Sequence, residues 1–149
     1  MDAKVTWKRN LSFTGTANSG FTIPLGTGGP AGDNDGTSPM ELLGISLAGC
    51  TGMDVIDILR KKRQDVTGFE VQVHGDRAGE HPRVFTHMLV EYVVTGHHVE
   101  QEAVERAVTL SVTKYCSVLA MLNKSAEIEH KITIIEDTSS TTAGNPKKA

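Results

Sequence analysis

Two cysteines carry the most distinctive chemistry in this sequence. Cys50 lies in SPMELLGISLAGCTGMDVIDIL, and Cys116 lies 66 residues later in KYCSVLAMLNKSAEIEHKI. A thiol near the start of a helix ionises more readily, because the positive end of the helix dipole stabilises the thiolate, and a thiolate is a nucleophile. Free cysteine is also among the most buried residue types, so a pair of inert core thiols is the competing interpretation.

Glu41 is a third candidate, and it has a local role of its own. In Ser38-Pro39-Met40-Glu41 the serine is a helix cap, the proline takes the first helical position and the glutamate completes a capping box. A helix turns by about 100° per residue and rises about 1.5 Å, which puts Glu41 and Cys50 on opposite faces, about 13 Å apart. We therefore expect that Glu41 cannot easily serve the Cys50 of its own chain.

Other kinds of site are disfavoured by residue types and charge. The six histidines are scattered, neither HxxxH nor CxxC occurs, and two cysteines are too few for a four-thiolate zinc site, so no metal is expected. Lys and Arg number 15 against 18 Asp and Glu, which lacks the basic excess of nucleic-acid-binding proteins. Asp54 and Asp57 lie on the Cys50 face of the helix, where carboxylates raise a thiol pKa unless a cation neutralises them.

The helix that carries Cys50 is expected to run from Pro39 to about Arg63. Residues 42–53 are nearly free of charge, which predicts burial on every face in the first half of the helix. One small sheet and one other helix cannot cover such a segment, so a second copy of the chain is expected to complete the core. The glycines around Cys50 indicate either tight helix packing or a ligand close to the backbone.

The remaining elements follow from the periodicity of apolar residues. We expect two or three half-buried strands between residues 5 and 25, a loop at 26–36, and a hairpin of strands at 66–76 and 83–94. A second helix should follow Gly96, with a break near Lys114, and a last strand should span Ile128 to Ile135. This order predicts an α+β fold, with a single domain over residues 1–137 and a disordered tail at 138–149.

Length and composition place few demands on folding. A chain of 149 residues with 38% hydrophobic content can bury a sizeable core without a metal or disulfide. The first ten residues contain no apolar leader segment, and no run of 18 uncharged apolar residues occurs. We expect a cytoplasmic protein with no membrane or nucleic-acid partner.

The two cysteine stretches together resemble the OsmC/Ohr family of thiol peroxidases, and the order of elements agrees over almost the whole chain up to Asp137. The resemblance implies antiparallel sheets wrapped around two central helices in an intertwined homodimer. It also implies that Cys50 attacks the peroxide, that Cys116 resolves the sulfenic acid as a disulfide, and that Glu41 orients an activating arginine. The family's arginine would fall in TANSGFTIPLG, which has none, so Arg9 is the nearest upstream candidate.

The resemblance therefore predicts a thiol-dependent peroxidase that needs a peroxide, a dithiol reductant and no cofactor. Ser117 follows Cys116 where better-characterised branches have proline, so the chain resembles a less characterised branch. The main alternative is a non-catalytic small-molecule-binding or redox-sensing protein of the same fold, which uses an apolar pocket. A structural dimer with inert cysteines is the third possibility.

Overall fold

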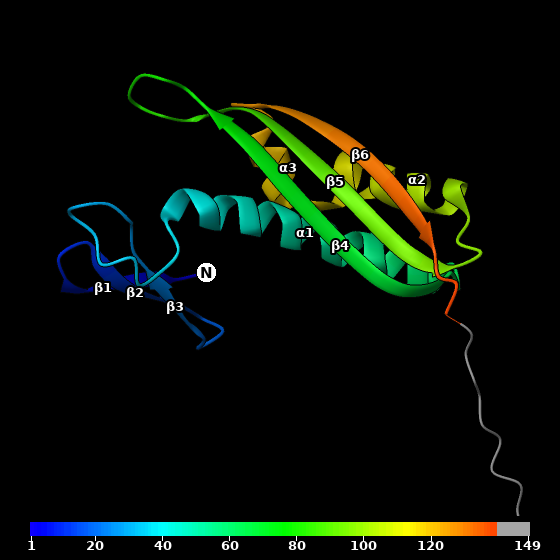
Figure 1. Cartoon of the computed structure of the whole chain (residues 1–149), viewed down its shortest axis with the longest axis horizontal. Coiled ribbons are helices and arrows are strands. Elements are labelled where there is room, and N and C mark those ends of the chain that lie inside the picture. Colours follow the sequence, from blue (N-terminus) through cyan, green and yellow to red (C-terminus); the bar gives the residue numbers. More distant parts are fainter. Residues whose placement is uncertain (140–149) are drawn as a thin grey trace, which may run out of the picture. The chain divides into compact units, whose positions relative to one another are not determined.

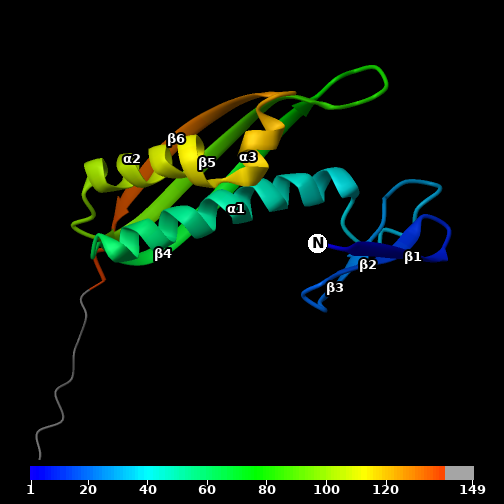
Figure 2. The same cartoon turned by 180° about the vertical axis from the view of Figure 1, so that it is seen from behind.

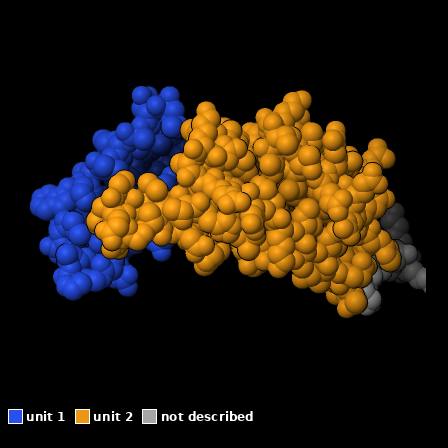
Figure 3. Space-filling view, turned by 90° about the horizontal axis from the view of Figure 1, so that it is seen from above, with its two compact units in different colours: residues 1–47 blue, residues 48–149 orange. Residues whose placement is uncertain are grey.

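The computed structural model describes residues 1–139. These residues group into two compact units, 1–47 and from residue 48 onward (Figure 3), and each unit holds one three-stranded sheet. The expected single domain over 1–137 stays a prediction. The tail expected at 138–149 lies, from residue 140 on, outside the described residues.

The first unit begins with an antiparallel sheet of β1 (Ala3–Arg9), β2 (Ser12–Ala17) and β3 (Thr22–Leu25). The strands are confirmed, but their expected half-burial is wrong for β1, in which all seven residues are exposed. Trp7, for example, is 63% exposed. Alternation of apolar and polar residues shows which side chains share a face of a strand, and it does not show whether anything covers that face.

Helix α1 (Pro39–Lys61) starts at the predicted capping box and ends two residues before the predicted Arg63. The Ser38 amide donates to Glu41 Oε2 at 2.7 Å, and the Glu41 amide donates to Ser38 Oγ at 3.3 Å. These reciprocal bonds satisfy amide groups that a helix leaves without partners at its start.

The expected burial of α1 on every face is wrong within the described chain. The buried side chains form one stripe at four-residue intervals, whereas Ile45 is 59% and Met53 is 73% exposed. The stripe consists of Leu47, Thr51, Val55 and Leu59. By length and composition alone α1 is apolar enough to span a membrane, a test that the core helix of a soluble protein also passes. Apolar composition shows that a surface needs cover, and it does not show which chain supplies the cover.

The second unit contains a sheet of β4 (Asp65–Arg77), β5 (Phe85–His97) and β6 (Glu127–Glu136), in that order. Strands β4 and β5 form the predicted hairpin. Strand β6 pairs with β5 in parallel, so the expectation of antiparallel sheets is wrong for this one pair of strands. The reason is the helical crossover between β5 and β6, which returns the chain to the end of the sheet where β5 began.

That crossover contains α2 (Gln101–Leu110), a π-helical segment (Ser111–Tyr115) and α3 (Ser117–Leu122). The predicted break near Lys114 falls at Cys116, whose backbone is extended (φ −72°, ψ 98°). Both views show α1, α2 and α3 on one face of the β4–β5–β6 sheet (Figures 1 and 2). Gly52 permits this approach, because a Cβ there would lie 3.3 Å from Val71 Cγ2.

Candidate active site

The two thiols, 66 residues apart in the sequence, are neighbours in the structure. Cys50 lies on α1 and is partly exposed, whereas Cys116 is only 3% exposed at the junction of the π-helical segment and α3. Both are free thiols, and a hydrogen bond with the Cys50 side chain helps to set the pKa of Cys116. The fold thus brings together the two residues that the sequence singled out, and only one of them has access to solvent.

Burial raises the pKa of the Cys116 thiol from 9.0 to about 12. The neighbouring Cys50 raises it further, through a hydrogen bond and through charge, and so does the carboxylate of Asp54. The start of α3 acts in the opposite direction, because the Leu119 amide donates to Cys116 Sγ at 3.4 Å. One amide does not outweigh the loss of solvation, so Cys116 is a protonated thiol at neutral pH.

A chain of buried hydroxyl groups lies beside the thiols. Thr51 Oγ1 is 2.8 Å from the Tyr92 hydroxyl and 2.9 Å from Ser111 Oγ, and Ser111 Oγ donates to Asp54 Oδ2 at 2.8 Å. Thr51, Tyr92 and Ser111 are inaccessible to solvent. The chain joins α1, β5 and the first residue of the π-helical segment.

The hydrogen bond from Ser111 Oγ to the Asp54 carboxylate gives this chain a direction. Each hydroxyl has one proton to donate. Because Ser111 donates its proton to Asp54, it can only accept a hydrogen bond from Thr51. Thr51 in turn accepts from Tyr92. Every proton in the chain therefore points toward Asp54, and loss of one hydroxyl leaves the preceding donor without a partner.

His130 of β6 lies at the far end of the chain. Its Nδ1 is 3.4 Å from the Tyr92 hydroxyl, and the two rings stack with centroids 6.1 Å apart. Burial lowers the pKa of His130, so a neutral imidazole is favoured there. Burial also raises the pKa of Tyr92 to about 12, which keeps its phenol protonated and able to donate.

Sequence reasoning assigned no role to Thr51, Ser111 or Tyr92. The available signal was a hydroxyl at each of three positions where the periodicity requires an apolar side chain. A buried hydroxyl needs a partner, so such positions mark a polar network before its members can be paired.

Glu41 and Arg9 both belong to the first unit, and each has partners there. The carboxylate of Glu41 is held by its cap, and the hydrogen bond from the Ser38 amide lowers its pKa. The Arg9 guanidinium pairs with Asp33 at 2.9 Å and with Asp35 at 3.1 Å. Arg9 thus anchors the glycine-rich loop 26–36. The contacts of Glu41 define one role for it, which is to complete the capping box of α1.

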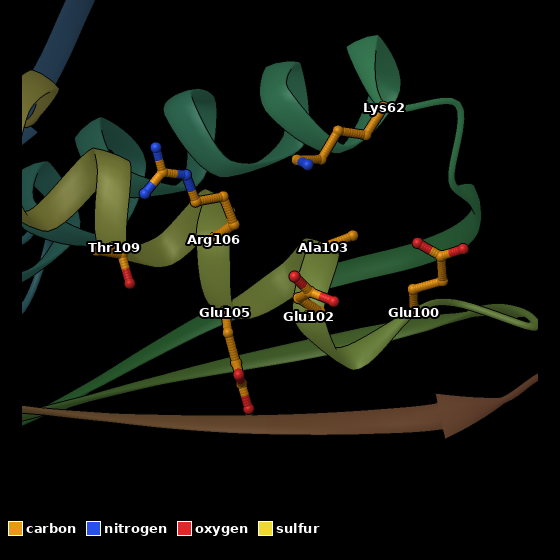
Figure 4. Close-up of a pocket in the computed structure, with 7 residues that line it drawn as sticks. All are labelled: Lys62, Glu100, Glu102, Ala103, Glu105, Arg106 and Thr109. Carbon is orange, nitrogen blue, oxygen red and sulfur yellow. The ribbon is translucent and has the colours of Figure 1, made fainter.

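A separate open cavity of about 540 Å³ lies beside the end of α1 and the start of α2 (Figure 4). Of the residues that line it, Ala103 and Thr109 are uncharged, and the other five are charged: Lys62, Glu100, Glu102, Glu105 and Arg106. Neither thiol is among them. This cavity is not the apolar pocket that a non-catalytic binding protein was expected to use.

Within residues 1–139, no group of three or more His, Cys, Asp or Glu side chains is placed to hold a metal ion. The Asp57 carboxylate, on the Cys50 face of α1, accepts a hydrogen bond from Lys61 one turn later on the helix, at 2.5 Å. Asp54 is the carboxylate that raises the pKa of Cys116.

The sequence model of the OsmC-like proteins matches residues 32–131. The chain belongs to the OsmC family. It is 42% identical over 135 residues to Protein YhfA of Escherichia coli strain K12, which covers 91% of this chain and 98% of YhfA.

Solved structures of OsmC relatives agree with the fold. A hypothetical protein from Aquifex aeolicus VF5 is 33% identical with a TM-score of 0.81, covering 91% of this chain and 96% of the other. An organic hydroperoxide resistance protein OsmC from Legionella pneumophila is 14% identical with a TM-score of 0.66, covering 89% and 95% of the two chains. At 14% identity the Legionella structure supports the α+β fold alone.

Proposed function

We propose that this OsmC-family protein is a thiol-dependent peroxidase, in which Cys50 attacks the peroxide and Cys116 resolves the product. The observation that carries the proposal is a pair of neighbouring free thiols with unequal exposure. A peroxide reaches the partly exposed Cys50, and the buried Cys116 is positioned to react with whatever forms on its neighbour.

The chemistry proceeds in two steps. The Cys50 thiolate attacks one peroxide oxygen, the O–O bond breaks, and the departing oxygen takes a proton to become an alcohol or water. Cys50 is then a sulfenic acid. The Cys116 sulfur attacks the Cys50 sulfur, the S–S bond forms, and the hydroxyl leaves with the Cys116 proton as water. A dithiol reductant restores both thiols and is itself oxidised to a disulfide.

The difference between the thiols supports this order. With a pKa of about 12, Cys116 has almost no thiolate at neutral pH and is a poor first nucleophile. Its proton is used in the second step, where it leaves as part of the water.

We also propose that the working form is an intertwined homodimer. The single chain exposes large apolar side chains on α1, on the N-terminal sheet and directly before β3: Val5, Trp7, Phe21, Ile23, Leu43, Ile45 and Met53. Exposed apolar groups in this number mark a surface that another chain covers. In such a dimer the carboxylate of Glu41 and an activating cation would come to Cys50 from the partner chain.

A cellular dithiol is needed for turnover, and a reducing compartment supplies it. We therefore place the protein in the cytoplasm as part of the proposal. No cofactor enters any step.

The test is peroxide consumption by the purified protein with dithiothreitol as reductant. The parent should consume organic or hydrogen peroxide over many turnovers, and Cys50→Ser should consume none. Cys116→Ser should complete the first step and then accumulate sulfenic and sulfinic acid on Cys50. If all three proteins leave the peroxide untouched, the thiols are inert or serve binding, and the peroxidase proposal is wrong.

A further inference from the structure

We propose that the hydroxyl chain of Tyr92, Thr51, Ser111 and Asp54 is a positioning device that holds the Cys116 sulfur against Cys50. The inference deepens the proposed function, because it assigns residues to the step in which Cys116 attacks. None of the four side chains has to react with the peroxide.

The connectivity of the chain carries this inference. Thr51 follows Cys50 directly on α1, so any shift of Thr51 along or around the helix also moves Cys50. Ser111 begins the π-helical segment, and the Cys116 amide donates to the Ser111 carbonyl at 2.9 Å. The Thr51–Ser111 bond therefore links the two backbone segments that carry the sulfurs. On one side Thr51 is the neighbour of Cys50 in the sequence, and on the other side the Ser111 carbonyl is hydrogen-bonded to the Cys116 amide.

Tyr92 and Asp54 hold the two ends of this link. Tyr92 projects from the central strand β5, which is paired on both sides and is the most constrained strand of the sheet. Asp54 lies one turn after Cys50 on α1 and fixes the Ser111 hydroxyl from the other side. Because all protons point toward Asp54, the chain is satisfied in one arrangement only, which fixes the register of α1 against the π-helical segment.

The alternative explanation for these bonds is that they only satisfy buried hydroxyls. The two explanations differ in what a broken link does to sulfur chemistry. A misplacement of about 1 Å can slow an intramolecular reaction by about 100-fold. A purely structural role lowers stability and leaves disulfide closure in the folded protein unchanged.

The experiment measures disulfide closure without peroxide. One equivalent of methyl methanethiosulfonate transfers its methylthio group to Cys50, which becomes a methyl disulfide, and methanesulfinate leaves. Attack by Cys116 on the Cys50 sulfur then forms the Cys50–Cys116 bond and releases methanethiol. Closure is followed by mass spectrometry in the parent and in Thr51→Val, which removes the hydroxyl with little change in shape. Thr51→Ser restores the hydroxyl.

Two variants serve as matched controls. Val55 lies one turn after Thr51 on the same buried stripe of α1. Val55→Ala therefore weakens the core and leaves the chain of hydroxyl groups intact. Thr113→Val removes a hydroxyl from the π-helical segment that donates only to the Thr109 carbonyl, at 2.7 Å. If Thr51→Val does not fold, Ser111→Ala breaks the same Thr51–Ser111 bond from the other side.

We expect closure in Thr51→Val to be at least about tenfold slower than in the parent, with Thr51→Ser, Val55→Ala and Thr113→Val close to the parent. Equal closure rates in Thr51→Val and the parent would overturn the inference, and so would an equally large slowing in Val55→Ala. The same proteins are then given peroxide. If the parent closes through the thiosulfonate and ignores peroxide, the proposed function fails while the positioning role stands.

Discussion

The buried phenol of Tyr92 leads to a specific prediction about alkaline stability. Burial raises its pKa from 10.0 to about 12 in the folded protein. Below pH 10 both folded and unfolded chains keep this proton, so Tyr92 adds no pH dependence. Between pH 10 and pH 12 the unfolded chain loses the proton while the folded protein keeps it, so the free energy of unfolding falls as the pH rises.

The size of this effect follows from the shift of about 2 in pKa. Each unit corresponds to about 1.36 kcal/mol, so Tyr92 should remove up to about 2.7 kcal/mol of stability by pH 12. Tyr92→Phe lacks this contribution. At neutral pH the variant should lose about 1 kcal/mol, because Thr51 gives up a hydrogen bond that it accepts and keeps the one that it donates.

The assay is urea unfolding of the parent and of Tyr92→Phe at intervals from pH 8 to pH 12. Ionisation of Cys116 also lowers stability in alkali, but it occurs in both proteins and largely cancels in the difference. We expect the parent to be more stable at pH 8 and to lose that advantage as the pH approaches 12. Parallel stability curves over the whole range would refute the buried-donor interpretation of Tyr92.

Two further predictions concern the dimer and the helix cap. Sedimentation should show a dimer at micromolar concentration. Met53→Lys should shift the equilibrium toward the monomer, because it would place a charge on the apolar surface that the partner chain is proposed to cover. A stable folded monomer of the parent would contradict this prediction. Glu41→Gln should keep the capping box and leave thermal stability close to the parent's, yet slow alkylation of Cys50 by iodoacetamide. Unchanged alkylation would reduce Glu41 to its capping role.

Local features of this fold could be predicted from the sequence because their causes are local. The capping box at Ser38 and Glu41 lies within four residues, and the β4–β5 hairpin follows from alternation on either side of one turn. The parallel pairing of β6 is different, since periodicity identifies a strand without naming its neighbour. The mistaken burial of α1 has a similar cause: Met53 is apolar whether its cover comes from its own chain or from another.

The candidate site was predictable in part for the same reason. Cys50 and Cys116 stood out because thiols are rare and chemically distinctive, and the family resemblance paired them. The hydroxyl chain joins Thr51 to Tyr92, which is 41 positions away in the sequence, and to Ser111, which is 60 positions away. One hydroxyl among apolar residues does not identify such a distant partner. Only the assembled core shows that the Thr51 hydroxyl lies within hydrogen-bond distance of both the Tyr92 and the Ser111 hydroxyls.

The reaction of the two thiols with peroxide tests the proposed roles of Cys50 and Cys116 most directly. The folded, fully reduced protein should be given one equivalent of cumene hydroperoxide, quenched by rapid alkylation and analysed by peptide mass spectrometry. We predict an intramolecular Cys50–Cys116 disulfide that dithiothreitol reverses. An unmodified Cys50, or oxidation of Cys116 ahead of Cys50, would contradict the assignment of a peroxidatic and a resolving thiol.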